Sequence, residues 1–447
     1  MLWRGSTRTI SPPPPCARWA SRRRGPPGPE TRSMTAGVSP RPVGSAFLIG
    51  YAVAYIGAFI GVAPLLQVLA PLHAEMIDGQ AKGPLLSQAL FWGCMAAGLG
   101  NIVGGALSDR TRSRHGRRRP WIVVGAVLTI GSYAAIQQSS TPLGLVLGLV
   151  AFQLTFNILL APLIALFADR VPENRRSAMS AVMGMGYPLA AMIGSVVMAW
   201  GPQGEVARFA TLAAVVLAAT VPFALLSRED PAPADRVRAP LSGFSLPSLL
   251  HPFAVRDFTL AWTYRFLVVT GYSLVAFYLL FYIADAIGFP ILFPGRSAEA
   301  GHSLLTAIAV VGVVGVSTVV AMGGSRITRR KPLAIAGGVL LAIAAAVLAT
   351  TQDWTTVVVA FALYGVGQGC YGAIDIALMT DVLPSVEDRG KDLGLINLAV
   401  TLPQAIAPLI ALVLLENLGL DFRSLFLAAA ACFGGATLAV ASIRRVR

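Results

Sequence analysis

The sequence predicts an all-α integral membrane protein with twelve transmembrane helices in two pseudo-symmetric halves of six. Of its 447 residues, 55% are hydrophobic and only 13% are charged, whereas soluble domains carry about 25% charged residues. Apolar runs long enough to cross a bilayer, roughly 20 residues as a helix, recur along the chain. Certain proline and aspartate residues of the first half of the chain also recur in the second half at a constant separation in residue number.

The predicted helices follow a short tail. Residues 1–44 are rich in Pro and Arg and lack the apolar core of a secretory signal, so we expect a disordered cytosolic tail. Translation could start at Met1 or at Met34. The predicted spans are 45–71, 85–108, 121–138, 142–168, 177–200, 207–227, 258–287, 303–324, 332–351, 354–380, 390–416 and 423–443.

The distribution of basic residues predicts the orientation. With a cytosolic N-terminus, 30 of the 35 Lys and Arg residues fall in the tail, the C-terminus or cytosolic loops. Arg265 lies inside a span, and the other side carries Lys82, Arg208, Arg296 and Arg423. Such a bias places both termini in the cytosol. It also explains the net charge of +14 without nucleic acid, because the arginines are dispersed over seven segments.

An internal repeat predicts how the helices are grouped. Three pairs of residues share an offset of 212: Pro120 with Pro332, Asp169 with Asp381, and Pro172 with Pro384. The repeat implies two parallel copies of a six-helix unit. We therefore expect an N-terminal bundle over 45–227, a polar, Pro-rich cytosolic linker over 228–257 and a C-terminal bundle over 258–447.

The loop after the second span contains the most specific motif. It reads SDRTRSRHGRRRP, and its key residues are Gly105, Asp109, Arg110, Gly116 and Arg118. This spacing resembles the loop motif of the major facilitator superfamily. The longer form SDRTRSRHGRRRPW resembles the sucrose/proton symporters and the related glycoside-pentoside-hexuronide carriers. NILLAPLIALFAD, YGAIDIALMTDVLP and RGKDLGLINLAVTLPQ support the same resemblance.

The resemblance implies a major facilitator fold with a cytosolic gate. Gly105 would allow close helix approach, and Asp109 could pair with Arg118 and with the positive end of a facing helix. The family suggests that this helix is the eleventh, near Gly390. The latch would break when the carrier opens inward. The other arginines, which we expect to anchor the topology and bind lipid phosphates, are Arg112, Arg114 and Arg117.

Two charged residues lie inside predicted spans, where charge is costly and usually functional. Arg265 in the seventh span and Asp375 in the tenth lie at similar depths. We expect them to face the central cavity, to pair in one state and to couple transport to an ion. The alternative is a buried ion pair with a purely structural role.

Polar residues recur at helical spacing within several spans and would be unfavourable against lipid. Amides could bind the hydroxyl groups of a sugar and aromatic rings its apolar face. Hydrogen bonding between helices is the alternative. The candidates for the substrate cavity are Gln67, Gln153, Asn157, Tyr272, Tyr364, Gln368, Tyr371, Asn397 and Gln404.

One position departs from the sucrose/proton symporters, where we expect an acidic residue four residues before the helix 4 asparagine. Here that position is Gln153. Asp375 could carry the proton instead, or the protein could be a uniporter or use another ion such as sodium.

Several other activities find no support. The four cysteines show no CxxC spacing and the four histidines lie far apart, so no metal site is indicated. The run GQGCYG lies inside an apolar helix and indicates close packing, not dinucleotide binding. No catalytic constellation or attached ATPase motif is found. We expect no enzyme activity and no cofactor besides the coupling ion.

The function predicted is secondary active transport of a small hydrophilic solute, a sugar or glycoside, coupled to protons. Alternatives are a major facilitator exporter of drugs or metabolites and, from another class, a non-transporting membrane sensor. The expected partners are the solute and membrane lipids, and we expect a monomer in the plasma or inner membrane.

Overall fold

The computed structural model describes residues 44–113, 115–171, 173–227, 251–323, 330–381 and 389–444. All of them belong to one compact unit, Val43–Arg447. The expected tail, apart from Gly44, and residues 228–250 of the expected linker lie outside the described residues. Within the described ranges the chain forms helices and no strand.

Twelve helices in these ranges are long and apolar enough to cross a membrane, and they coincide with the twelve predicted spans. The all-α membrane fold class is therefore confirmed. The first half contains α1 (Ser45–Pro64) with η1 (Leu65–Leu69) and α2 (Ala70–Ile77), α3 (Lys82–Arg110), α4 (Arg119–Gln137), α5 (Pro142–Arg170), α6 (Glu173–Trp200) and α7 (Glu205–Leu226). The second half contains η2 (His251–Ala254), α9 (Arg256–Phe281) with η3 (Tyr282–Ala286), α10 (Phe289–Leu292), α11 (Ala298–Gly323), α12 (Arg330–Thr350), α13 (Trp354–Asp381), α14 (Arg389–Leu412) with η5 (Val413–Asn417), and α15 (Phe422–Ala441).

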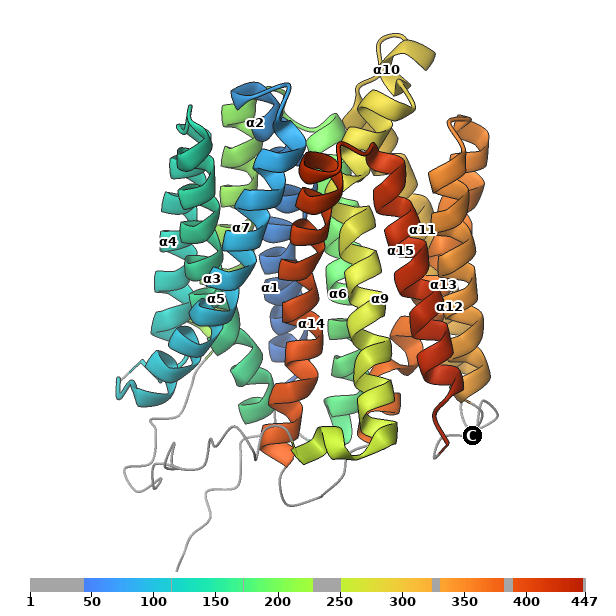
Figure 1. The fold of residues 1–447 in the computed structure, drawn as a ribbon. Helices are drawn as coiled ribbons and strands as arrows, with labels where there is room; N and C mark the ends of the chain where they lie inside the picture. Colours follow the sequence, from blue (N-terminus) through green and yellow to red (C-terminus); the bar gives the residue numbers. More distant parts are fainter. Residues whose placement is uncertain are drawn as a thin grey trace, which may run out of the picture. The chain divides into compact units, whose positions relative to one another are not determined.

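The helices pack as two repeated groups (Figure 1). In the first group α3 packs on α5, α4 on α5 and α7, and α1 on α6 and α7. In the second, α11 and α12 pack on α13, and α15 packs on α12 and α9. The groups meet where α3 contacts α14 and where α6 contacts α11. We call the end of the bundle that carries residues 108–120 the arginine end, and the opposite end the far end.

Glycines at repeated positions bring helices close in both halves. A Cβ at Gly100 would lie 2.8 Å from a backbone atom of α5, and one at Gly312 would lie 2.7 Å from the backbone of α13. Gly125 and Gly337 approach α5 and α13 in the same way. Both pairs share the 212-residue offset that the sequence analysis found. The repeat in the sequence is thus a repeat of packing contacts, because only glycine permits such backbone approach.

A second repeated contact ties the third helix of each half to the end of its sixth. Arg119 donates hydrogen bonds to the carbonyl oxygens of Ala224 and Leu225 at the end of α7. Lys331, which lies 212 residues later, donates to the carbonyl oxygen of Ile443 after α15 at 2.7 Å. The last carbonyl groups of a helix lack partners within the helix and carry partial negative charge. A cation in each half therefore stabilises this helix end.

Candidate functional site

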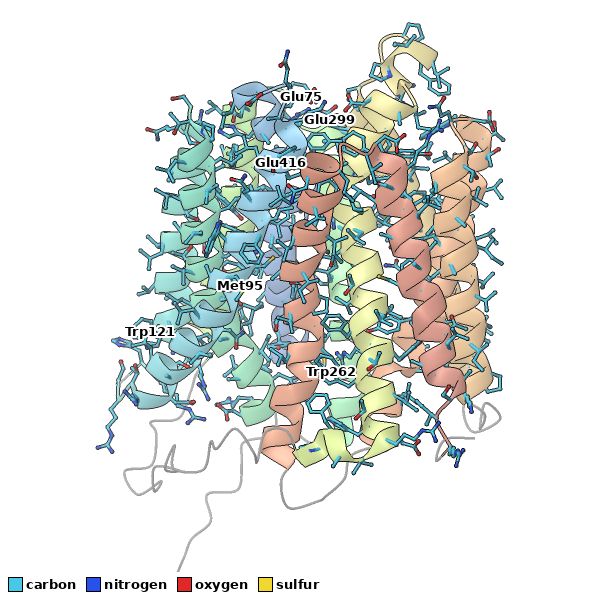
Figure 2. The ribbon with its side chains drawn as sticks, in the orientation of Figure 1. Glu75, Met95, Trp121, Trp262, Glu299 and Glu416 are labelled. Atoms are coloured by element: carbon cyan, nitrogen blue, oxygen red, sulfur yellow. The ribbon has the colours of Figure 1, made fainter. Side chains whose placement is uncertain are left out.

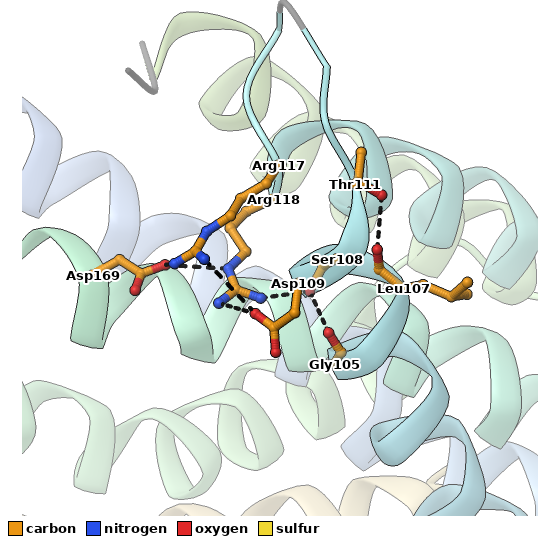
Figure 3. A network of polar contacts seen from close by, with 8 residues as sticks. All are labelled: Gly105, Leu107, Ser108, Asp109, Thr111, Arg117, Arg118 and Asp169. Atoms are coloured by element: carbon orange, nitrogen blue, oxygen red, sulfur yellow. Dashed lines mark hydrogen bonds and ion pairs between the residues drawn. The ribbon is translucent and has the colours of Figure 1, made fainter. Parts of the chain in front are cut away.

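The arginine-rich loop forms a charge network at the arginine end of the first half (Figure 3). An Nη of Arg118 lies 2.7 Å from Asp109 Oδ1, and its Nε lies 3.2 Å from Asp169 Oδ2. Arg118 also donates to the Ser108 hydroxyl at 2.6 Å. Arg118 is buried, whereas Asp109 is 59% exposed. The expected pair of Asp109 with Arg118 is thus present, and its second anchor is Asp169 on α5.

Two expectations about this loop need correction. Arg117, expected to act only as an anchor, lies 2.6 Å from Asp169 Oδ2 and belongs to the network. No atom would come within 4 Å of a Cβ on Gly105, so this glycine makes no close approach in this conformation. Gly100 and Gly104 make that approach instead, against the backbone of α5. The expected contact with the helix near Gly390 involves side chains outside those that the structure describes.

Polar contacts join the two halves at the far end. The Nζ of Lys82, at the start of α3, lies 2.8 Å from Glu75 Oε1 and 2.9 Å from Asp285 Oδ2 of the second half. An Nη of Arg208 in α7 lies 2.9 Å from Glu299 Oε1 in α11. Figure 2 labels Glu75 and Glu299 at this end of the bundle. These contacts hold the far end closed.

A buried hydrogen bond and a stacked cation lie beside these ion pairs. The hydroxyl groups of Ser87 and Tyr278 are 2.5 Å apart, and the Arg296 guanidinium lies 4.9 Å from the centre of the Trp200 ring. Both contacts join residues of different halves. At the arginine end, the ion pairs of Arg117 and Arg118 with Asp109 and Asp169 lie within the first half. The conformation is therefore closed at the far end.

A cavity lies between the halves. Its empty volume is about 440 Å³, counting the part open to solvent. Helices α6, α9, α11 and α13 and the π-helical segment η1 line it. None of its 13 described lining residues is charged. The polar lining residues are Gln67, Tyr272, Thr306, Tyr364 and Gln368.

Hydrogen bonding at the cavity wall reaches across the boundary between the halves. The Gln67 amide donates to the Tyr187 hydroxyl at 3.1 Å. Tyr187 in turn hydrogen-bonds with Tyr272 of α9, and the two rings lie 6.3 Å apart at an edge-on angle. Gln67 lies in η1, a π-helical turn that follows Pro64, and such turns are frequent at functional sites.

This arrangement can be compared with known proteins. The family model described as "Major Facilitator Superfamily" matches residues 44–325 and 295–447, which together cover the whole described unit. The chain belongs to the Major Facilitator Superfamily. No curated protein sequence matches it.

Solved structures of major facilitator transporters share the fold. The nucleoside transporter NupG aligns with a TM-score of 0.67 at 12% identity, covering 90% of this chain and 100% of that one. A bacterial homologue of the human lysosomal transporter Spinster, inward-facing and unoccupied, aligns at 0.62 and 16%, covering 89% and 95%. The peptide transporter POT in complex with sulfate aligns at 0.66 and 12%, covering 89% and 93%. At these identities the similarity shows the fold alone.

In this major facilitator protein, only some of the candidates for the substrate cavity line the cavity between the halves. Gln67, Tyr272, Tyr364 and Gln368 line the cavity, as expected of them. The others are not among its lining residues. Gln153 packs near Gly93 of α3, and the Asn157 amide donates to the Gln153 carbonyl oxygen at 2.9 Å. The Asn397 side chain lies outside the described part, and Gln404 is half-buried in α14.

Arg265 and Asp375 form the expected pair, with an Nη 3.3 Å from Asp375 Oδ2. They lie beside the cavity lining rather than on it. Tyr371, one turn from Asp375, hydrogen-bonds to this carboxylate and packs against Tyr264, with ring centres 5.9 Å apart. Arg265 Nε, Asp375 Oδ1 and the Tyr264 hydroxyl have no hydrogen-bond partner among the described residues. The pair is thus buried but incompletely satisfied, which is costly for charged groups.

Helical spacing in the sequence does not identify Tyr187, Thr306 or the far-end ion pairs. Tyr187 and Thr306 stand alone in apolar runs, and a single polar residue carries no periodic signal. The sequence contains a partial signal for the far-end ion pairs, since Lys82 and Arg208 are among the few basic residues on that side. Their partners could not be found from spacing, because Asp285 and Glu299 come from the other half.

Proposed function

We propose that this protein is a secondary active transporter that moves a small, uncharged hydrophilic solute, a sugar or glycoside, by alternating access. The cavity between the halves is the observation that carries this proposal. Its wall offers amide and hydroxyl groups together with aromatic rings, and its described lining has no charge. Such a wall suits a neutral polyhydroxylated solute, whereas an ionic solute would be left without a counter-charge.

Coupling to protons is part of the proposal. The carboxylate of Asp375 has one oxygen facing Arg265 and one without a partner. A proton on Asp375 would release Arg265, and loss of that proton would restore the pair. This exchange of partners would link the protonation of one buried site to the packing of α9 against α13. The ion could also be sodium, as the sequence analysis left open.

The membrane orientation follows from the bias of basic residues and is proposed with it. The arginine end would face the cytosol, in the plasma or inner membrane, with both ends of the chain on that side. The described conformation, closed at the far end, would then be inward-facing. The variant Ser113→Cys, which places a cysteine in the arginine-rich loop, tests this orientation. Labelling of that cysteine by an impermeant reagent from outside intact cells would contradict it.

Uptake into proteoliposomes tests the function. Labelled sucrose, methyl α-D-glucopyranoside and a cationic dye are offered with and without an imposed pH gradient. We expect uptake of at least one sugar, stimulated when the gradient drives protons in the same direction. Movement of the dye with failure of every sugar would instead favour the exporter of drugs or metabolites. A charged-sugar control, glucuronate, should not be taken up.

A further inference from the structure

Tyr364 lines the cavity with a hydroxyl group that has no hydrogen-bond partner among the described residues. The side chain is only 3% exposed. Phe361 and Phe433 hold the ring, with centres at 5.6 and 6.2 Å. Buried hydroxyl groups are normally paired, and leaving one unpaired is unfavourable. A partner that arrives with the cargo would remove this cost.

Other buried tyrosines show what a satisfied hydroxyl looks like here. Tyr133 donates to the Gly61 carbonyl oxygen at 2.7 Å, and Tyr282 donates to the Leu348 carbonyl oxygen at 3.0 Å. Tyr264 shares the lack of a partner, but it does not line the cavity. Among the described tyrosines, Tyr364 alone combines a position on the cavity wall with an unpaired buried hydroxyl.

Tyr364 lies next to the boundary between the halves, so a solute bound to its hydroxyl group could also contact the other half. Tyr364 lines the same cavity as Gln67 and Tyr272, and Gln67 hydrogen-bonds to Tyr187 at the cavity wall. Gln67 and Tyr187 belong to the first half, and Tyr272 and Tyr364 to the second. A solute that bonds to Tyr364 and Gln67 would therefore touch both halves at once.

We infer that the Tyr364 hydroxyl is a specificity determinant that binds one hydroxyl group of the cargo, while Gln67 binds the same molecule from the other half. The inference rests on the proposed function and narrows it to solutes with a hydroxyl group at a defined position. Neighbouring side chains cover the Tyr364 hydroxyl in this conformation, so the wall must move for cargo to reach it. Binding and the relative position of the halves are then linked, because cargo bonded to both Gln67 and Tyr364 spans their boundary.

Deoxy sugars combined with phenylalanine variants test the inference. Tyr364→Phe removes the hydroxyl and keeps the ring, and Tyr264→Phe is the matched control for loss of an unpaired buried hydroxyl. Uptake of methyl α-D-glucopyranoside, sucrose and the monodeoxy forms of the glucoside is measured in proteoliposomes. We expect Tyr364→Phe to raise KM about tenfold for a sugar that wild type transports, the effect of one lost hydrogen bond. One monodeoxy form lacks the hydroxyl group that Tyr364 binds. For this form the wild-type protein should show the same rise in KM, and Tyr364→Phe should raise KM no further.

Each outcome bears on a different statement. If Tyr364→Phe weakens uptake of the parent sugar and of every deoxy form equally, Tyr364 has a structural role and the inference is overturned. An unchanged KM, or the same shift in Tyr264→Phe, would also overturn it. In those cases wild-type uptake would still support the proposed function. If wild type takes up none of these sugars, the proposed cargo is wrong and the inference falls with it.

Discussion

The ion pair between Arg208 and Glu299 gives the sharpest test of how the far end closes. Its side chains, 12% and 10% exposed, come from different halves. Glu299→Gln keeps the shape but leaves the Arg208 charge in a poorly hydrated place. Exposed pairs contribute up to about 1 kcal/mol, and breaking a fully buried pair costs about 3–5 kcal/mol. For this partly buried pair we expect about 2 kcal/mol.

The open state would escape this cost, because separation of the halves returns Arg208 to water. At about 1.4 kcal/mol per tenfold change, the ratio of far-end-open to far-end-closed molecules should rise roughly 30-fold. A population of about 1% open would become about 20% open. A smaller effect, below about fivefold, is expected if water already screens the pair as it does at a surface.

Distances between spin labels measure this ratio in detergent, whatever the membrane orientation. Met76 on α2 and Ile291 on α10 are exposed far-end positions in different halves and can carry the labels. The native cysteines are first replaced: Cys16, Cys94, Cys370 and Cys432. We expect Glu299→Gln to increase the fraction of long distances.

Asp421→Asn is the matched control. Asp421 and Arg423 form an exposed ion pair 3.8 Å apart within the second half. Its loss should leave the distances unchanged. An unchanged open fraction in Glu299→Gln, or the same increase in Asp421→Asn, would refute the assignment of Arg208 and Glu299 as a closing contact. Exchange of the two charges in a double variant should restore the wild-type distribution.

Three further predictions follow from the packing and the buried charges. Asp375→Asn should abolish concentrative uptake and leave exchange intact, so normal accumulation by this variant would exclude Asp375 as the coupling group. Gly100→Ala should lower Tm in detergent by several degrees, at a cost of about 2 kcal/mol, because its Cβ would lie 2.8 Å from a backbone oxygen of α5. Gly98→Ala is the control and should leave Tm unchanged, because no atom lies within 4 Å of its Cβ. Equal Tm values for the two variants would contradict this reasoning. Arg119→Ala and Lys331→Ala should each lower Tm by a similar amount, about 1 kcal/mol in stability, and a loss in only one half would argue against equivalent roles.

Much of the fold could be predicted because the bilayer imposes strict rules. A helix that crosses it must be long and apolar, and backbone groups must be paired within it. All twelve spans therefore appear as apolar runs, and the predicted ends differ from those observed by at most 8 residues. The offset of 212 residues was visible in loop residues such as Pro120, and it proved to hold for the contacts of Gly100 and Arg119 as well.

The site was only partly predictable, because helical spacing identifies a face but not its depth or its neighbour. Tyr364, Gln368, Tyr371 and Asp375 lie on one face of α13, as predicted. The first two line the cavity, whereas the last two meet Arg265 and its surroundings nearer the arginine end. The same spacing placed Gln153 and Asn157 on one face of α5, yet that face packs against α3.

By itself, the sequence determined that this chain spans a membrane twelve times as two related halves, because hydrophobicity and repetition are properties of the chain that need no partner. It also marked Asp109, Arg118, Arg265 and Asp375 as unusual charges. Only the tertiary structure decided which polar groups meet across the boundary between the halves. Those contacts join residues far apart in the chain, and neither spacing nor hydrophobicity indicates which of these residues meet.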